Sequence, residues 1–361
     1  MKAAVLLGNN NIVYTDIEEP ILEHGYAKIK VYVCGVCGSD IPRVHNNAAH
    51  NYPLVLGHEF SGEIIDISEN TFDLKVGDSV SVAPLIPCNN CSDCHSGNYS
   101  LCEKYSFIGS RQQGGLAEYV VVPIQNLVKI PSNLSYVTAA LIEPSTVALH
   151  ALKVCGFGGN KTAVVIGCGI IGIFTIQWLK LLGATKVIAV ARGCQAKLAA
   201  QKAGADIVLE DNVNDFLTNQ VWESYGFASY VFDCVGSEKT ICTSLQAVEK
   251  KGCICFIGTP KTKVTIPIAT WEKILRKECH VTGSWMSYSA PFPGEEWTES
   301  VNAFSKKTLK VFPEMISGTH HLESVADVFA QIKEAKPRGR VLFLINECDS
   351  NCMDAKIEIE Y

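Results

Sequence analysis

The stretch Thr162-Ala-Val-Val-Ile-Gly-Cys-Gly-Ile-Ile-Gly172 decides the fold. Its largely apolar beginning is typical of a buried strand, and the segment 170–182 has helical patterning. A glycine-rich turn between strand and helix allows a tight bend, a close approach to a pyrophosphate and a helix–sheet contact, and the helix amide groups face the phosphates. We therefore expect a dinucleotide-binding turn, with a purely structural turn as the alternative. Its residues are Gly167, Gly169, Ile170, Ile171 and Gly172.

Strand and helix patterns continue to alternate after this turn. Strands are predicted at 186–191, 207–209, 230–234 and 253–257, and a helix at 195–203. Such alternation predicts a doubly wound parallel sheet, with helices on both faces. Before about residue 150, short alternating segments such as 27–33 and 79–83 indicate a compact, partly antiparallel β domain. The alternation fades beyond about residue 285, and we expect the last segment to rejoin the first domain and end in a strand at 340–345.

The end of the second strand bears on the choice of cofactor. A carboxylate there would bind the ribose hydroxyls of NAD, but this chain has Ala191-Arg192-Gly193. This strand end has no carboxylate that would repel the 2′-phosphate of NADP, and Arg192 could pair with that phosphate. Ala191 and Arg192 therefore favour NADP(H) over NAD(H). A solvated surface arginine in an NAD enzyme is the alternative.

Four cysteines lie within one polar segment: Cys88, Cys91, Cys94 and Cys102. Zn²⁺ favours four thiolates in a tetrahedron, and two-residue spacers let neighbouring sulfurs converge on one ion. Ordinary buried thiols would have no reason to recur at this spacing among Asn, Ser and Asp. We expect a structural zinc site. Because its coordination shell is closed, the chemistry must lie elsewhere.

A second candidate metal site lies upstream. Cys37 follows Cys-Gly-Val at 34–36, and His58-Glu59 stands in Gly-His-Glu-Phe-Ser-Gly at 57–62, so a thiolate, an imidazole and a carboxylate come from two loops. A mixed set with an open position suits catalytic zinc. From spacing alone, a structural role for each residue is the alternative.

The composition fits a soluble intracellular enzyme. The 361 residues, 47% of them hydrophobic and 19% charged, suggest two domains with sizeable cores. The net charge of -6 argues against nucleic acid as a partner. No apolar run approaches the roughly 20 residues that cross a membrane, and Asn9, Asn10 and Asn11 interrupt the start too soon for a signal peptide. Together with 16 cysteines, these features predict a cytoplasmic location.

Several motifs occur in the order found in a known family. They are Gly-His-Glu-Phe-Ser-Gly, the four-cysteine segment, Gly-Gly-Leu-Ala-Glu-Tyr at 114–119, Ile-Glu-Pro at 142–144 and the Gly-Cys-Gly-Ile-Ile-Gly turn. Over nearly its whole length, the chain resembles the zinc-dependent medium-chain alcohol and polyol dehydrogenases. The resemblance implies a GroES-like catalytic domain at 1–149 with a zinc lobe at 84–105. It also implies a Rossmann domain at 150–285 and a return to the catalytic domain at 286–361.

The resemblance further implies roles at the upstream site. Cys37, His58 and Glu143 would be the ligands of the catalytic zinc, and Glu59 would be an adjacent carboxylate able to enter its shell. Such a zinc acts as a Lewis acid on the substrate hydroxyl, and the cofactor accepts the hydride. Ser39 would be the first proton relay, with a simple turn hydroxyl as the alternative.

Three stretches are similar to the subgroup that oxidises sugar-alcohol phosphates such as galactitol 1-phosphate. They lie at 38–43, at 107–111, and at 273–278 with 283–286. A phosphate needs a cationic anchor, and guanidinium groups pair bidentately with it, so Arg43 and Arg111 are the candidates. Exposed or structural arginines are the alternative. Unphosphorylated polyols or secondary alcohols, of the sorbitol or butanediol type, also stay open as substrates.

Other classes on the same fold fit this sequence less well. A zinc-free quinone or enone reductase would lack the metal ligands, and a catalytically silent zinc-binding protein would be expected to lose the open site. The resemblance implies a homodimer or homotetramer. His45 and His50 could contact a substrate hydroxyl, and the alternative is that they are surface histidines without such a role. For Trp285, Tyr288, Phe292 and Trp297, packing is favoured over lining the cleft. The tail at 346–361 is expected to be mobile or loosely packed.

Overall fold

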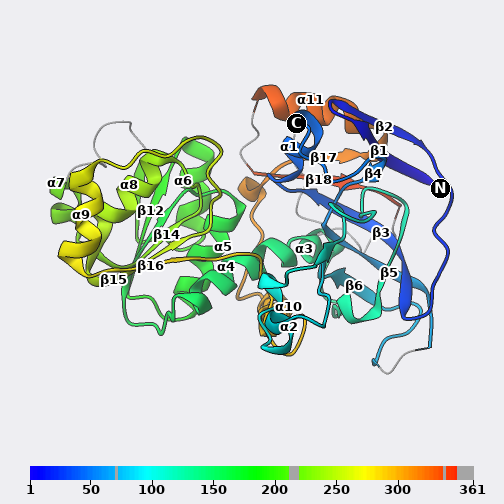
Figure 1. Ribbon diagram of the computed structural model, residues 1–361, viewed down its shortest axis with the longest axis horizontal. Coiled ribbons are helices and arrows are strands. Elements are labelled where there is room, and N and C mark those ends of the chain that lie inside the picture. The colour runs from blue at the N-terminus through cyan, green and yellow to red at the C-terminus, as the bar shows by residue number, and fades with distance from the viewer. Residues whose placement is uncertain (70–71, 211–218, 336–338, 348–361) are drawn as a thin grey trace. The chain divides into compact units, whose positions relative to one another are not determined.

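The computed structural model describes residues 1–69, 72–210, 219–335 and 339–347. Its contacts divide the chain into two compact units, which are coloured along the chain in Figure 1. Unit 1 comprises Met1–Glu143, Tyr288–Lys307 and the described part of Ile316–Tyr361. Unit 2 comprises Pro144–Ser287 and Thr308–Met315. Of the helices in the described part of the chain, none could span a bilayer.

Unit 2 is built on a parallel sheet whose strands run in the order β13-β12-β11-β14-β15-β16. The strand pairs of this sheet are all parallel. Its strands are β11 (Thr162–Ile166), β12 (Lys186–Ala191), β13 (Ile207–Glu210), β14 (Ala228–Asp233), β15 (Val248–Phe256) and β16 (His280–Gly283). This is the parallel sheet predicted from the alternating pattern. The short edge strand β16 was not predicted.

Helices cover both faces of this sheet, as Figure 1 shows. They are α4 (Ile142–Val154), α5 (Ile170–Leu181), α6 (Cys194–Lys202), α7 (Asn219–Tyr225), α8 (Glu238–Ala247) and α9 (Ile268–Lys277). One face carries alternate strand residues such as Val164 and Ile166, which pack with Trp222 of α7, Leu245 of α8 and Ile274 of α9. Helices α5 and α6 contact β11, β12 and β13. The inner strands β11 and β12 are buried at nearly every position, as expected for a sheet that is covered on both faces.

Unit 1 is mainly antiparallel. Its largest sheet has the order β10-β6-β5-β3-β18-β17, and β9 also pairs with β3. Its strands are β3 (Tyr26–Val36), β5 (Glu59–Ile67), β6 (Ser79–Val82), β9 (Tyr119–Pro123), β10 (Leu127–Lys129), β17 (Ile316–His321) and β18 (Arg340–Leu344). Smaller sheets are formed by β1 (Lys2–Gly8), β2 (Asn11–Asp16) and β4 (Leu54–Val55), and by β7 (Leu85–Ile86) and β8 (Ser106–Phe107). The predicted combination of a partly antiparallel β domain with a doubly wound parallel sheet is confirmed.

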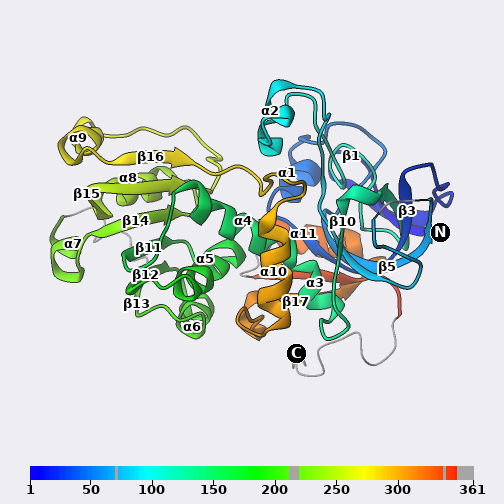
Figure 2. The same ribbon diagram turned by 90° about the horizontal axis from the view of Figure 1, so that it is seen from below.

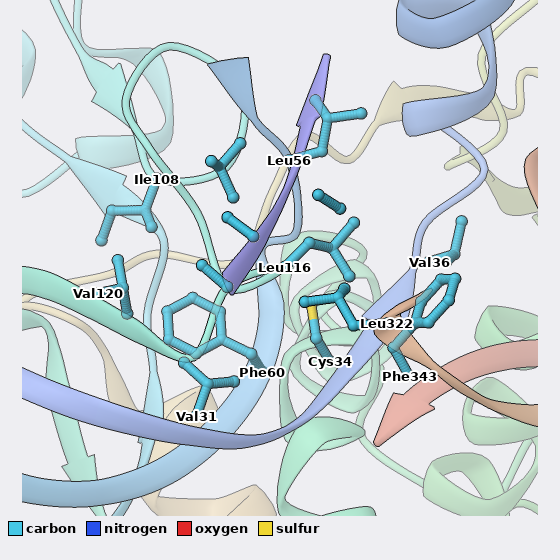
Figure 3. Close-up of a cluster of buried hydrophobic side chains, with 14 of the residues drawn as sticks. Val31, Cys34, Val36, Leu56, Phe60, Ile108, Leu116, Val120, Leu322 and Phe343 are labelled. Carbon is cyan, nitrogen blue, oxygen red and sulfur yellow. The ribbon is translucent and has the colours of Figure 1, made fainter. Parts of the chain in front are cut away.

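The helical segments of unit 1 are short. They are α1 (Asp40–His45), α2 (Ser92–His95), α3 (Tyr136–Ala140), α10 (Glu295–Ser305) and α11 (Val325–Ala335), with 3-10 turns η1 (Tyr99–Leu101), η2 (Ile124–Asn126) and η4 (Leu322–Ser324); a further 3-10 turn, η3 (Pro313–Met315), belongs to unit 2. Figure 3 shows side chains of β3, β5, β9 and β18 packing together in the core of unit 1. Phe60 and Cys34 belong to this core; Phe60 directly follows Glu59, and Cys34 stands three residues before Cys37. The predicted strand at 340–345 is β18. Most of the tail at 346–361 lies outside the described residues.

Candidate active site and zinc lobe

The structure brings three predicted metal ligands together in unit 1. One donor atom from each of Cys37, His58 and Glu59 lies within 4.8 Å of the others. We call these three residues the metal triad. His58 and Glu59 are buried, and Cys37 is partly exposed.

Strand register explains why the triad forms. Strands β3 and β5 pair antiparallel, with Gly35 opposite Glu59. Cys37 comes just after the end of β3, and His58 comes just before the start of β5. Because the end of one strand lies beside the start of its antiparallel neighbour, the two loops must deliver their side chains to the same place.

Glu59 is buried against a buried arginine. Arg340 Nε of β18 is 2.9 Å from Glu59 Oε2, in an ion pair without hydrogen-bond geometry, and Arg340 Nη1 donates to the carbonyl of Val36 at 2.7 Å. Burial raises the pKa of the Glu59 carboxyl to about 8, although the Arg340 charge opposes this shift. Arg340 therefore limits how strongly the carboxylate is destabilised.

Asp40 of α1 supports the other two members of the triad. Its Oδ2 accepts a hydrogen bond of 3.0 Å from the backbone N of Cys37, and its Oδ1 lies 3.6 Å from Nδ1 of His58. Asp40 is 1% exposed, so its charge acts at close range. A carboxylate placed beside a ligating histidine orients the imidazole ring. Sequence reasoning assigned Asp40 no role, although it stands three residues after Cys37.

Glu143 does not join the group of donor atoms that meet within 4.8 Å. It is nevertheless buried and close enough to the triad for electrostatic interaction. Burial, followed by the charge of Glu59, raises the pKa of the Glu143 carboxyl to about 7, while His58 opposes the shift. The site thus holds two carboxyls whose pKa values lie well above the usual value of a glutamate.

The four-cysteine segment forms a second cluster in unit 1. One sulfur from each of Cys88, Cys91, Cys94 and Cys102 lies within 4.8 Å of the others. The backbone N of Cys88 donates to Cys102 Sγ at 3.2 Å. Hydrogen bonds from the backbone at Cys94 and Glu103 lower the pKa of the Cys91 thiol to about 6. Donors that stabilise thiolates, together with four converging sulfurs, match the chemistry of a tetrathiolate zinc site.

The glycines of the predicted dinucleotide turn have distinct surroundings in unit 2. Gly167 follows β11 with φ +90°, a conformation that favours glycine. A Cβ on Gly172 would lie 1.9 Å from the carbonyl oxygen of Gly167, so only glycine allows α5 to pack this closely. A Cβ on Gly169 would meet no atom within 4 Å. Open space beside Gly169, at the N-terminus of α5, fits the approach of a pyrophosphate, with Ile170 and Ile171 in the first turn.

The predicted cofactor-discriminating residues stand at the end of β12. Ala191 is buried and is the last residue of the strand, and Arg192 is exposed. The backbone N of Gly167 donates to the carbonyl of Val190 at 3.0 Å, which ties the glycine turn to this strand end. The turn and Arg192 are therefore neighbours within unit 2.

The two predicted phosphate anchors have different partners. Arg43 Nη1 donates to Ser39 Oγ at 2.8 Å and to Asp40 Oδ1 at 3.1 Å. Arg111 lies over the ring of Tyr105, 4.2 Å from its centroid, and its Nη1 donates to the Tyr105 carbonyl at 3.3 Å. Arg43 is thus linked to the predicted proton relay.

The two histidines of the 45–50 region have different surroundings in the structure. His45 has both ring nitrogens within hydrogen-bond distance of acceptors, at 2.8 Å from Asn10 Oδ1 and 2.9 Å from the Phe329 carbonyl, and it holds α1 in place. His50 is exposed and lies near two arginines. Although the residue is exposed, partial desolvation of its ring, then the charges of Arg111 and Arg43, lower the pKa of His50 below its usual value.

The aromatic residues near the end of the chain mostly pack with one another in unit 1. The Tyr288 ring stacks on Phe292 at 5.8 Å and on Trp297 at 6.0 Å between centroids. Tyr288 Oη accepts a hydrogen bond of 3.0 Å from the backbone N of Leu85. These three residues pack against one another, the interpretation that the sequence favoured. Trp285, in unit 2, is 53% exposed.

Comparison with known proteins places these sites in a family. Residues 23–132 match the family described as alcohol dehydrogenase GroES-like domain, and residues 171–306 match the family described as zinc-binding dehydrogenase. Galactitol 1-phosphate 5-dehydrogenase of Escherichia coli (strain K12) is 36% identical over 318 residues, which cover 88% of this chain and 92% of the relative. The chain belongs to the zinc-binding dehydrogenase family.

Another relative and a solved structure show a similar likeness. (R,R)-butanediol dehydrogenase of Bacillus subtilis (strain 168) is 34% identical over 286 residues, covering 76% of this chain and 78% of the relative. The crystal structure of galactitol-1-phosphate dehydrogenase from Escherichia coli has a TM-score of 0.90 and 34% identity, covering 95% of this chain and all of the other.

Two further structures contain cofactor. A zinc-binding dehydrogenase from Sinorhizobium meliloti 1021 bound to NADP has a TM-score of 0.86 with 28% identity, covering 95% of this chain and 98% of the other. An alcohol dehydrogenase from E. coli CFT073 complexed with NADH has a TM-score of 0.85 with 25% identity, covering 95% and 99%. As a zinc-binding dehydrogenase, this chain is a zinc-dependent alcohol or polyol dehydrogenase that uses a nicotinamide cofactor.

Two residues beside the triad of this zinc-binding dehydrogenase were not assigned a role from the sequence. Arg340 reaches Glu59 from β18, far away in the sequence, and an isolated arginine before an apolar run predicts only a strand end. Asp40 follows Cys-Gly-Ser, where it also fits the first turn of a helix. Its position three residues after a metal-binding cysteine could have indicated a supporting role.

Proposed function

We propose that this chain oxidises the hydroxyl of a sugar-alcohol phosphate to a ketone with NADP⁺, using one catalytic and one structural zinc ion. The observation that carries the proposal is the buried metal triad with arginines close beside it. A thiolate, an imidazole and carboxylates suit a zinc site with a position left for substrate, and the arginines suit an anionic group on that substrate. Substrates of the relatives, such as galactitol 1-phosphate and butanediol, mark the range of alternatives.

The residues of the triad fit a zinc ion chemically. Among the described residues, the buried His58 Nδ1 has no hydrogen-bond partner, with Asp40 Oδ1 3.6 Å away, and the buried Glu59 Oε2 has only its ion pair with Arg340, so a further group at the site would be favourable. We assign Cys37, His58 and Glu143 as ligands and Glu59 as a neighbouring carboxylate able to replace one of them. A zinc ion there would supply Lewis-acid chemistry to the substrate hydroxyl, and the nicotinamide would accept the hydride.

Ser39 is the proposed first acceptor of the substrate proton. It stands two residues after Cys37, and its Oγ already accepts a hydrogen bond of 2.8 Å from Arg43. The nearby guanidinium favours negative charge on this oxygen, so Ser39 can pass its own proton onward as it takes one from the substrate. Ser39→Ala should lower kcat by about a hundredfold, the usual size of an acid–base contribution.

Metal content tests the two-zinc proposal directly. The purified full-length chain should contain two zinc ions, one in the triad and one in the lobe formed by Cys88, Cys91, Cys94 and Cys102. Cys37→Ala should remove one ion and abolish oxidation while leaving the lobe ion in place. A wild-type chain with one zinc ion would leave only the lobe filled and would contradict the assignment of the triad.

The cofactor preference depends on Arg192. An exposed guanidinium at the end of β12, without a carboxylate in Ala191-Arg192-Gly193, suits the 2′-phosphate of NADP. The kcat/KM for NADP⁺ should exceed that for NAD⁺, and Arg192→Ala should reduce the value for NADP⁺ much more than that for NAD⁺. A higher kcat/KM for NAD⁺ in the wild type would refute this preference.

The substrate phosphate is proposed to bind Arg111 and Arg43. Arg111→Ala should raise KM for galactitol 1-phosphate far more than KM for galactitol, since the lost contact involves only the phosphate. Equal effects on the two substrates would remove the phosphate from the proposal and leave an unphosphorylated polyol as substrate. We further propose a homodimer or homotetramer in the cytoplasm, acting on small molecules and not on nucleic acid or membranes.

A further inference from the structure

Hydrogen bonds connect two loops and one helix of unit 1 beside the metal triad. Helix α1 carries Arg43, and the following loop at 46–53 carries His50. The backbone N of Ala48 donates to the carbonyl of Pro42 at 3.2 Å, so this loop folds back onto the helix next to Arg43. The backbone of the loop that carries His50 therefore lies against the helix that carries Arg43.

The third segment is the loop at 108–114, which carries Arg111. The backbone N of Val55 donates to Gln113 Oε1 at 2.6 Å, and the backbone N of Gly114 donates to the carbonyl of Val55 at 2.8 Å. Val55 belongs to β4, which directly follows the loop with His50. These hydrogen bonds hold the loop that carries Arg111 beside β4, the strand that follows the loop with His50.

The same third loop touches the metal triad. Gly109 has φ +76°, and a Cβ there would lie 2.2 Å from the carbonyl oxygen of Gly57 and 2.9 Å from the backbone N of His58. The Phe107 ring meets the His58 ring edge-on with 5.5 Å between centroids. Arg111 therefore follows directly after a segment that packs against a proposed zinc ligand.

The positive charges of Arg43 and Arg111, which lie near His50, are only partly compensated by carboxylates. Asp40 pairs with Arg43 at 3.1 Å. Among the described residues, no carboxylate forms an ion pair with Arg111 or His50. Two arginines and a histidine with so little neutralisation favour an anion in this place.

We propose that His50 is a specificity-determining residue, which together with Arg111 and Arg43 selects a phosphate monoester dianion over a singly charged carboxylate or a neutral polyol. This inference rests on the proposed function and names the anionic group that its substrate carries. His50 provides the third donor for the three terminal oxygens of a phosphate. A carboxylate has only two oxygens and one charge, and one guanidinium fork can satisfy both.

The selection depends on proton uptake. In the protein without substrate, the groups that face His50 are Arg111 and Arg43, and with burial they favour the neutral ring. A dianion placed between the three side chains reverses this balance, because opposite charge favours the imidazolium. Phosphate binding should therefore protonate His50, whereas a neutral polyol should leave it neutral.

Calorimetry of the zinc-loaded, full-length chain tests this proposal. Galactitol 1-phosphate is titrated at about pH 7.5, where a phosphate monoester with a second pKa near 6 is already a dianion. Measurements in two buffers of different ionisation enthalpy give the number of protons taken up. We expect uptake of a substantial fraction of one proton with galactitol 1-phosphate and none with galactitol. A sugar acid such as L-idonate should bind more weakly and take up less.

The variant His50→Gln keeps a hydrogen-bond donor but cannot carry a charge. It should abolish the proton uptake and weaken galactitol 1-phosphate binding about tenfold, as expected for one charge-assisted hydrogen bond. The matched control is His24→Gln, which makes the same change at an exposed turn outside the cluster. NMR of the His50 ring in the wild type gives a second measurement that needs no variant, since its pKa should rise when galactitol 1-phosphate binds.

The outcomes separate this inference from the proposed function. Binding of galactitol 1-phosphate without proton uptake, or uptake that persists in His50→Gln, overturns the role of His50 and leaves the dehydrogenase intact. If the wild type oxidises galactitol but binds no phosphate ester, both the proposed phosphate anchor and the proposed role of His50 are overturned. Uptake linked to His50 in a protein that oxidises no alcohol overturns the catalytic proposal alone.

Discussion

Gly172 and Gly169 stand three residues apart in one turn, but their surroundings predict opposite effects of the same substitution. Gly172→Ala would place a methyl group 1.9 Å from a backbone oxygen that cannot move away. We expect it to push α5 from β11 and to lower the free energy of unfolding by roughly 1–3 kcal/mol, the usual cost of overpacking. Urea unfolding measures this change.

The matched variant is Gly169→Ala. Gly169 has φ -78° and open space around it, so alanine should change the free energy of unfolding by less than about 0.5 kcal/mol. The same methyl group would stand where the pyrophosphate approaches, and NADP⁺ affinity measured by fluorescence should fall. If Gly172→Ala were as stable as the wild type, the assigned helix–strand contact would be wrong.

At the scale of elements, the end of α8 depends on a side chain from α9. Lys277 Nζ donates to the carbonyls of Leu245, Gln246 and Val248 at 3.1, 2.8 and 2.5 Å. These groups lie at the C-terminal end of α8, where helix carbonyls lack partners and the helix dipole favours a cation. Lys277→Met should lower the free energy of unfolding by about 2 kcal/mol. Amide exchange at 245–248 should accelerate at the same time.

Arg276→Met is the control for this prediction. Arg276 is adjacent on the same helix, but its ion pair with Glu272 is largely exposed. Its loss should cost at most about 0.5 kcal/mol. Equal effects of the two substitutions would mean that Lys277 contributes only surface charge.

The zinc lobe is a second element whose stability we expect to depend on few residues. Cys94→Ser removes one of four sulfurs and should reduce the zinc content from two ions to one. The 84–105 segment contains short helices and little apolar core, so without the ion it should be cut faster by trypsin. Cys242→Ser, a buried thiol in α8, is the control and should keep both ions. Retention of two ions by Cys94→Ser would contradict the assigned site.

At the scale of the whole molecule, unit 2 exposes an apolar surface at one end of its sheet. Its residues, with their exposed fractions, are Ile268 81%, Trp271 54%, Leu275 70%, Val281 45% and Trp285 53%. The first three form a stripe along α9, and the others lie in or after β16. Figure 2 shows α9 and β16 at this end of the sheet. In the described chain, β16 pairs only with β15, so its other edge is open.

We expect this surface to join two copies of the chain. An open edge strand can pair with its own copy about a twofold axis, and such pairing would bury the exposed apolar side chains beside it. The double substitution Trp271→Glu and Leu275→Glu should reduce the mass measured by light scattering to that of a smaller assembly. Ile21→Glu, at 84% exposure in unit 1, should not change it. An unchanged mass in the double variant would exclude this interface.

The elements that were not predicted share a physical reason. Strand β16 has the sequence His-Val-Thr-Gly and is mostly exposed, so it lacks the apolar run that identified the inner strands. It forms because β15 offers it a row of unpaired backbone groups. Strand β17 was not predicted either. Its sequence, Ile-Ser-Gly-Thr-His-His, forms a strand because it pairs with β18.

The sequence by itself determined what depends on neighbours along the chain. Glycine spacing indicated the turn after β11, and cysteine spacing indicated the lobe, because the groups that must meet there are separated by only a few residues. Only the tertiary structure decided what surrounds the triad. The register of β3 with β5 joins Cys37 to His58, β18 delivers Arg340 to Glu59, and three separate segments gather Arg43, His50 and Arg111. Contacts of this kind depend on strand pairing and loop packing over long separations, which a local pattern does not encode.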